Sequence, residues 1–196
     1  MIDPSKFETL NVADTCSIWN VLASRTLQTA ARSAHVSLCL TEFVRYECLH
    51  KPGQSRPERA ELQNRLRREV RSGGVSAYSI DLEDLQDVET LDKRKRVSKG
   101  ELSSIVFAKK TQQAFMTDDK KAANLARTMI PTDKVQSTPH LLGWLYFNGR
   151  LLDADKVTIL TELEELNRNL RTQIEETYHE ALRCRLMSQA SADSQP

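Results

Sequence analysis

Short apolar stretches alternate with amphipathic helical patterns through the first three quarters of the chain. The first expected strand ends at residue 13. Further strands are expected over residues 35–40, 75–80, 114–116 and 135–137. The first expected helix begins near Ser17. Further helices are expected over residues 41–49, 58–71, 98–109, 120–129 and 140–147. Strands that alternate with helices are typical of a parallel sheet covered by helices. We therefore predict an α/β fold.

The last quarter of the chain follows a different pattern. Apolar residues recur every three or four positions from Asp155 to about Met187, which predicts one long helix with an apolar stripe. We expect an α/β domain over residues 1–153, an amphipathic helical extension over 154–187 and a disordered tail over 188–196. The six glycines and six prolines are too few for an all-β fold rich in tight turns.

Charge and hydropathy exclude several classes of protein. Lysine and arginine number 28 against 27 aspartates and glutamates, so the net charge of +1 excludes a uniformly basic nucleic-acid coat. No apolar run approaches the roughly 18 residues that a membrane span needs. The first ten residues also lack the pattern of a signal peptide. We expect a cytoplasmic protein with no membrane contact.

Acidic residues follow the expected strands at the edge where α/β proteins bind ligands. Asp14 ends the first strand, and Asp118 and Asp119 end a later one, while Glu47 lies two turns into the helix after the second strand. Glu101 lies at the start of the helix before the strand that ends at Asp118. Carboxylates gathered at one edge repel one another unless a cation binds between them.

Mg²⁺ and Mn²⁺ prefer such oxygen ligands, whereas the four cysteines and four histidines lack the paired spacings of zinc sites. Two structural interpretations stay open at this point. Asp14 is also a suitable helix cap, and Glu47 is also compatible with a position on the rim of the core.

Four motifs carry these acids in a recognisable order. They are VADT at residues 12–15, TEFVRYECL at 41–49, KGELSSI at 99–105 and FMTDDKKA at 115–122. In this order they resemble the four acidic motifs of PIN-domain nucleases. The segment STPHLLG at 137–143 resembles the last strand and helix of bacterial toxin-type PIN proteins. The resemblance covers about residues 10–152.

The resemblance implies a three-layer α/β/α sandwich with a central parallel sheet, and hydrolysis of RNA phosphodiester bonds with one or two Mg²⁺ or Mn²⁺ ions. The implied catalytic and metal-binding residues are Asp14, Glu47, Glu101, Asp118 and Asp119. Either aspartate of the last pair fits the fourth motif, and Glu101 replaces the aspartate that many members have. Thr15 and Thr117 match hydroxyl residues beside the acids, where they hold a carboxylate or a water molecule near the substrate.

Basic residues near these motifs are candidates for substrate contact. The cluster directly before Glu101 contains Lys93, Arg94, Lys95, Arg96 and Lys99. Residues 51–72 carry a local excess of four positive charges, for which a solvated face is an equally good interpretation. By contrast, residues 162–180 carry a net charge of minus four, which predicts a face that repels RNA.

The expected function is that of a metal-dependent endoribonuclease, the toxin of a toxin–antitoxin pair or a related defence nuclease. RNA is the expected substrate. An antitoxin protein or a second copy of the chain is expected to cover the stripe of the C-terminal helix, and packing on the chain's own α/β domain is the alternative. The alternatives are a non-catalytic PIN-like interaction module and a DNA-directed nuclease.

Overall fold

The computed structural model describes residues 3–52, 56–81, 83, 85–86, 88–89 and 97–192. Its centre is a parallel sheet of five strands in the order β3-β2-β1-β4-β5. The strands are β1 (Leu10–Ala13), β2 (Ser37–Thr41), β3 (Val75–Tyr78), β4 (Ala114–Met116) and β5 (Val135–Gln136). The predicted α/β fold with a central parallel sheet is confirmed.

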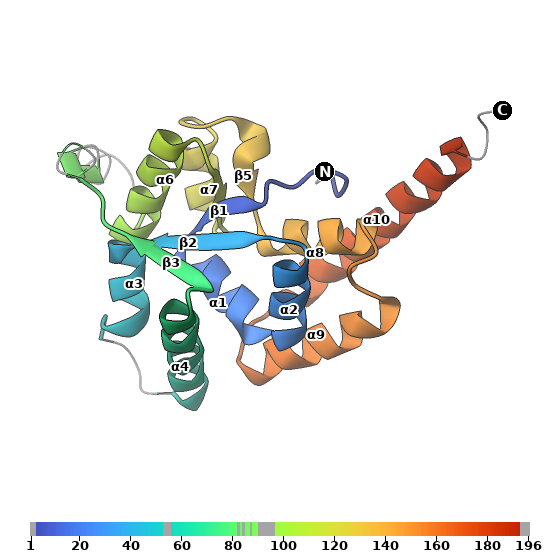
Figure 1. Ribbon diagram of the computed structural model, residues 1–196, viewed down its shortest axis with the longest axis horizontal. Helices are drawn as coiled ribbons and strands as arrows, with labels where there is room; N and C mark the ends of the chain where they lie inside the picture. Colours follow the sequence, from blue (N-terminus) through green and yellow to red (C-terminus); the bar gives the residue numbers. More distant parts are fainter. Residues whose placement is uncertain are drawn as a thin grey trace.

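Helices cover both faces of the sheet and make three layers (Figure 1). One face is covered by α6 (Lys99–Thr111) and α7 (Lys120–Ala126). The other packs against α1 (Thr15–Ala23), α2 (Arg25–Ser33), α3 (Glu42–Leu49), α4 (Pro57–Ser72), α8 (Thr138–Phe147), α9 (Asp153–Glu165) and α10 (Arg171–Ala192). A short 3-10 turn, η1 (Thr132–Lys134), leads into β5.

The two faces of the sheet bury alternate residues of the same strands. In β1, Val12 packs toward α6 and α7, whereas Ala13 packs toward the larger set of helices. Phe115 and Met116 divide in the same way in β4. All four side chains are fully buried, as expected for a sheet covered on both sides.

A helix boundary at Ser24 was absent from the sequence prediction. Ser24 ends α1 in an extended conformation and is the N-cap of α2, where its hydroxyl accepts a hydrogen bond from the backbone N–H of Leu27 in the first turn. The same hydroxyl donates to Glu162 Oε2 over 2.6 Å. A serine capped in this way breaks the helix without any glycine or proline.

The prediction of one continuous helix over residues 155–187 is wrong. The chain forms α9 and α10, which are separated by residues 166–170. Asn167 adopts a left-handed conformation with φ of 57°, which asparagine tolerates better than most residues. The backbone N–H of Arg168 then donates to Leu163 O, which closes the end of α9. The predicted disordered tail is also wrong for residues 188–192, which belong to α10, while 193–196 lie outside the described residues.

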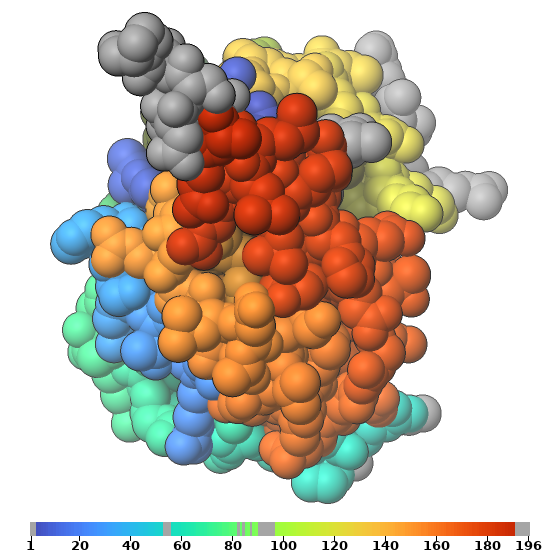
Figure 2. All heavy atoms as spheres, turned by 90° about the vertical axis from the view of Figure 1, so that its right-hand side faces the viewer, coloured from blue at the N-terminus to red at the C-terminus, as the bar shows by residue number. Residues whose placement is uncertain are grey.

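The apolar stripe of this segment packs on its own chain. Ile159, Leu163 and Ile174 are at most 1 % exposed and belong to the core below the sheet. Gly143 of α8 leaves no room for a Cβ beside Thr177 of α10, so the two helices approach closely. Figure 2 shows α9 and α10, in orange and red, spread over one side of the molecule. The stripe therefore gives no reason to expect a homodimer, whose existence stays a prediction.

Within the described part of the chain, no helix has both the length and the apolar character needed to cross a lipid bilayer.

We expect Ile159→Ala to lower the free energy of unfolding by about 2–5 kcal/mol, because it leaves a cavity in a closed core. Val157→Ala, on the same helix at a residue that is 66 % exposed, should change it by less than about 0.5 kcal/mol. Urea denaturation measures both values. Equal effects of the two substitutions would show that α9 does not pack on the core.

Candidate functional site

The strand pairing brings the first and fourth acidic motifs together. Ala13 is paired with Met116, so the residues that follow, Asp14 and Thr117, leave adjacent strands at the same edge. The backbone N–H of Asp14 donates to Met116 O over 3.1 Å. β4 is paired with β5 in the same way, and this pairing brings Thr138 beside Asp118.

Asp14 is a fully buried carboxylate. Its Oδ1 accepts hydrogen bonds from the backbone N–H and the hydroxyl of Ser17, both 2.7 Å long, and its Oδ2 accepts one from Thr117 Oγ1 over 2.5 Å. Asp14 is thus the N-cap of α1. Burial raises its pKa from 3.8 to about 6, the bonds from Ser17 and Thr117 oppose this rise, and the charge of Asp118 adds to it.

Asp118 and Asp119 have different environments. Asp118 Oδ2 accepts from Asn20 Nδ2 over 2.7 Å and from Thr138 Oγ1 over 2.5 Å, and its Oδ1 accepts from the Thr138 N–H. Asp119 instead turns to the N-terminus of α7, where it accepts from two backbone N–H groups. The structure therefore brings Asp118 to Asp14 and gives Asp119 a capping role.

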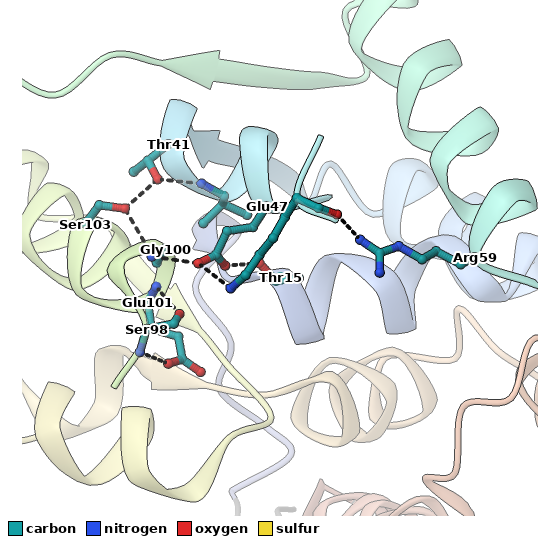
Figure 3. A network of polar contacts seen from close by, with 10 residues as sticks. Thr15, Thr41, Glu47, Arg59, Ser98, Gly100, Glu101 and Ser103 are labelled. Atoms are coloured by element: carbon teal, nitrogen blue, oxygen red, sulfur yellow. Dashed lines mark hydrogen bonds and ion pairs between the residues drawn. The ribbon is translucent and has the colours of Figure 1, made fainter. Parts of the chain in front are cut away.

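Glu47 reaches the same edge from α3. Its Oε2 accepts from Thr15 Oγ1 over 2.9 Å, and its Oε1 lies 3.4 Å from the Gly100 nitrogen and 3.7 Å from Lys51 Nζ. Figure 3 shows the carboxylate pointing toward Thr15 and Gly100. A Cβ at position 100 would lie 2.5 Å from Glu47 Oε2, so the glycine makes room for this carboxylate.

Glu101 points away from Glu47. Its side chain accepts from the Ser98 N–H over 2.7 Å, and the Ser98 hydroxyl in turn accepts from the Glu101 N–H (Figure 3). This is a reciprocal capping box at the start of α6. Lys99 is exposed at the same helix end, while Lys93, Arg94, Lys95 and Arg96 lie outside the described residues.

Four residues of the site were not predicted from the sequence as site residues: Ser17, Asn20, Thr138 and Arg168. Asn20 is buried and lies between two partners: it donates to Asp118 and accepts at Oδ1 from Arg168 Nε over 2.6 Å. Thr138 also donates a hydrogen bond to the Asp118 carboxylate. Asn20 has a sequence signal, because residues 14, 17 and 20 share one face of α1 at a spacing of three.

Arg168 offered no such signal. It lies within residues 162–180, whose net charge of minus four predicts a face that repels RNA. One of the acids of this segment does not contribute to an open acidic face, because the Glu162 carboxylate accepts hydrogen bonds from the Ser24 hydroxyl and from the Thr26 N–H.

Two hollows open beside these acids. The Asp118 hollow, of about 460 Å³, is lined by residues that include Thr117, Asp118 and Asp119. The Glu47 hollow, of about 340 Å³, is lined by residues that include Thr15, Glu47 and Arg168. The connection between α9 and α10 contributes to both, through Leu170 in the first and Arg168 in the second. Asp14 is fully buried beneath this surface and lines neither hollow, but Thr117, which donates to its carboxylate, lines the first.

A divalent cation is compatible with the chemistry of this donor set. Among the residues that the structure describes, no three His, Cys, Asp or Glu side chains form a group able to hold a metal ion. Mg²⁺, however, commonly binds through one or two carboxylates and keeps several waters. Asp14 and Asp118 are such a pair, and their mutual repulsion and the burial of Asp14 are costs that a cation would offset.

Comparison of the sequence with family models and with curated proteins assigns no family. No family model matches the chain, and no curated protein shows significant sequence similarity to it. The function proposed below therefore depends on the geometry of the site and on the motifs described above.

The raised pKa of Asp14 predicts a pH-dependent stability in metal-free buffer. The folded protein binds the Asp14 proton more tightly than the unfolded chain, so this contribution is complete below about pH 4 and is lost as the pH rises through about 6. Asp14→Asn keeps the cap and removes the titration. We expect its stability relative to the wild type to increase by about 2 kcal/mol between about pH 4.5 and about pH 7.5.

Urea denaturation at the two pH values in EDTA measures this difference. A stability difference that is the same at both would show that Asp14 is ionised without cost in the folded protein.

Proposed function

We propose that this chain is a metal-dependent endoribonuclease of the PIN type. The observation that carries the proposal is the pair Asp14 and Asp118, which follow adjacent parallel strands and are each held by hydroxyl and N–H donors. Asp14 is buried and lies near the charge of Asp118. Without a bound cation, keeping both carboxylates ionised therefore costs folding free energy. The resemblance of the motifs points to the same chemistry.

Each side chain of the site has a distinct role in the proposed hydrolysis. Asp14 and Asp118 would hold Mg²⁺ or Mn²⁺, which supplies charge neutralisation at the scissile phosphate and activation of water. Ser17 and Thr117 fix the orientation of Asp14, and Asn20 and Thr138 fix that of Asp118. Glu47 Oε1 has only long contacts, so this atom is the candidate acceptor for the proton of the attacking water.

The biological setting follows from the resemblance alone. In the toxin-type members of the family, such an activity is held in check by an antitoxin protein. We place the enzyme in the cytoplasm as a toxin or a related defence nuclease, with RNA as substrate and an antitoxin as partner.

A non-catalytic interaction module is the second candidate. It is favoured by the capping roles of Asp14, Glu101 and Asp119, which give three of the five acids a structural reason to be present. In that case Asp14 and Asp118 would stabilise the fold without binding a metal.

The neighbouring acids Asp118 and Asp119 allow a matched test. We expect Asp118→Asn and Asp14→Asn to lower the rate of RNA cleavage at least a hundredfold, because each loses a metal-binding charge. Asp119→Asn should stay within a few fold of the wild type, since asparagine caps a helix as well as aspartate does. The measurement is the cleavage rate of total RNA by purified protein with Mg²⁺ or Mn²⁺.

Thermal unfolding provides the control that all three variants are folded. A wild-type protein that leaves RNA intact with either ion would favour the interaction module. Cleavage by folded Asp14→Asn at the wild-type rate would refute the assignment of the site.

A further inference from the structure

Cations from two distant segments line the hollow beside Glu47. Four of them border it: Lys51, Arg56, Arg59 and Arg168. Two acids, Glu47 and Glu58, also line it, so four positive and two negative side chains give a net charge of plus two. Lys51 follows the C-cap of α3, and Arg56 and Arg59 are the N-cap and a first-turn residue of α4, whereas Arg168 comes from the connection between α9 and α10.

Arg168 is fixed at the edge of the acid pair. Its Nε donates to Asn20, which binds Asp118, and its Nη2 lies 3.3 Å from Cys16 Sγ. Arg168 is therefore linked to Asp118 through a single side chain, that of Asn20.

Arg59 and Lys51 are also held in place by contacts within the fold. Arg59 Nη2 donates to Lys51 O over 2.7 Å, which ties the first turn of α4 to the end of α3 (Figure 3). Lys51 Nζ lies 3.7 Å from Glu47 Oε1. A guanidinium held by the backbone loses little freedom when it binds a phosphate, so these cations are suited to a polyanion.

The same hollow has an apolar wall. Trp19, Leu62 and Leu166 line it beside the cations, and Trp19 keeps 9 % of its surface exposed. Its volume of about 340 Å³ is at the lower end of ligand sites, which suits one nucleotide rather than a duplex. Only an unpaired strand can present a base to such a wall while its phosphates contact cations.

We propose that the Glu47 hollow binds the phosphodiester backbone of single-stranded RNA, with Arg59 and Arg168 on its phosphates and a base against Trp19. The connection between α9 and α10 thus completes the substrate site. This inference rests on the proposed function and identifies where its substrate lies.

The test measures binding without cleavage. Fluorescence anisotropy of a labelled single-stranded oligoribonucleotide in EDTA gives the affinity at salt concentrations between about 50 and 200 mM. We expect Arg168→Gln and Arg59→Gln each to weaken binding about tenfold and to reduce the slope of log affinity against log salt by about 0.7. Arg171→Gln is the matched control, because Arg171 is exposed and paired with Glu164 over 2.6 Å.

Arg168→Lys separates phosphate binding from a structural role. Lysine keeps the charge without the bond geometry of the guanidinium, so it should restore the salt slope if Arg168 contacts a phosphate. An arginine that only anchors the connection would not be rescued in this way.

The outcomes distinguish this inference from the proposed function. Wild-type RNA cleavage with unchanged affinity and slope in Arg59→Gln and Arg168→Gln would overturn the inference alone. Equal affinity for a duplex of the same sequence would also overturn it. A wild-type protein that neither binds nor cleaves RNA would overturn both.

Discussion

The parallel pairing of β1 with β4 is the constraint on which the candidate site depends. Ala13 and Met116 are partners in this pairing, so Asp14 and the Thr117–Asp118 pair must emerge side by side. The neighbouring pairing of β4 with β5 adds Thr138 on the other side of Asp118. The register of three short strands thus fixes the backbone positions of the two acids and of their hydroxyl partners Thr117 and Thr138.

This arrangement has an electrostatic cost that the helices only partly offset. Asp14 uses the N-terminus of α1 and the hydroxyls of Ser17 and Thr117, yet burial still raises its pKa to about 6. Four of the described helices instead use a serine or threonine hydroxyl at their start, at Ser24, Thr41, Ser98 and Ser137. A buried carboxylate is a costly cap, which is why we attribute a further role to Asp14.

The fold was predictable because its signals are local. Apolar strands and periodic helices alternate strongly enough to predict the sheet, and the acids at strand ends follow from that order. The choice between Asp118 and Asp119 was not predictable, because it depends on which carboxylate faces Asn20 and which faces the N-terminus of α7. Glu101 likewise fits a nuclease motif and a capping box equally well in sequence.

The C-terminal segment was harder still. Its stripe continues through residues 166–170 without a glycine or proline, so the break between α9 and α10 has little sequence signal. The position of Arg168 depends on that break and on a long-range bond to Asn20, which lies 148 residues earlier in the chain. The guanidinium of Arg168 therefore belongs to the site, although it lies in a segment whose net charge is negative.

The central claim is that Asp14 and Asp118 together bind a divalent cation. Isothermal titration calorimetry with Mn²⁺ at about pH 7.5, above the raised pKa of Asp14, tests it most directly. The account predicts binding by the wild type and by Asp119→Asn, and at least a tenfold weaker association with Asp14→Asn and with Asp118→Asn. Equal Mn²⁺ affinity in all four proteins would contradict it.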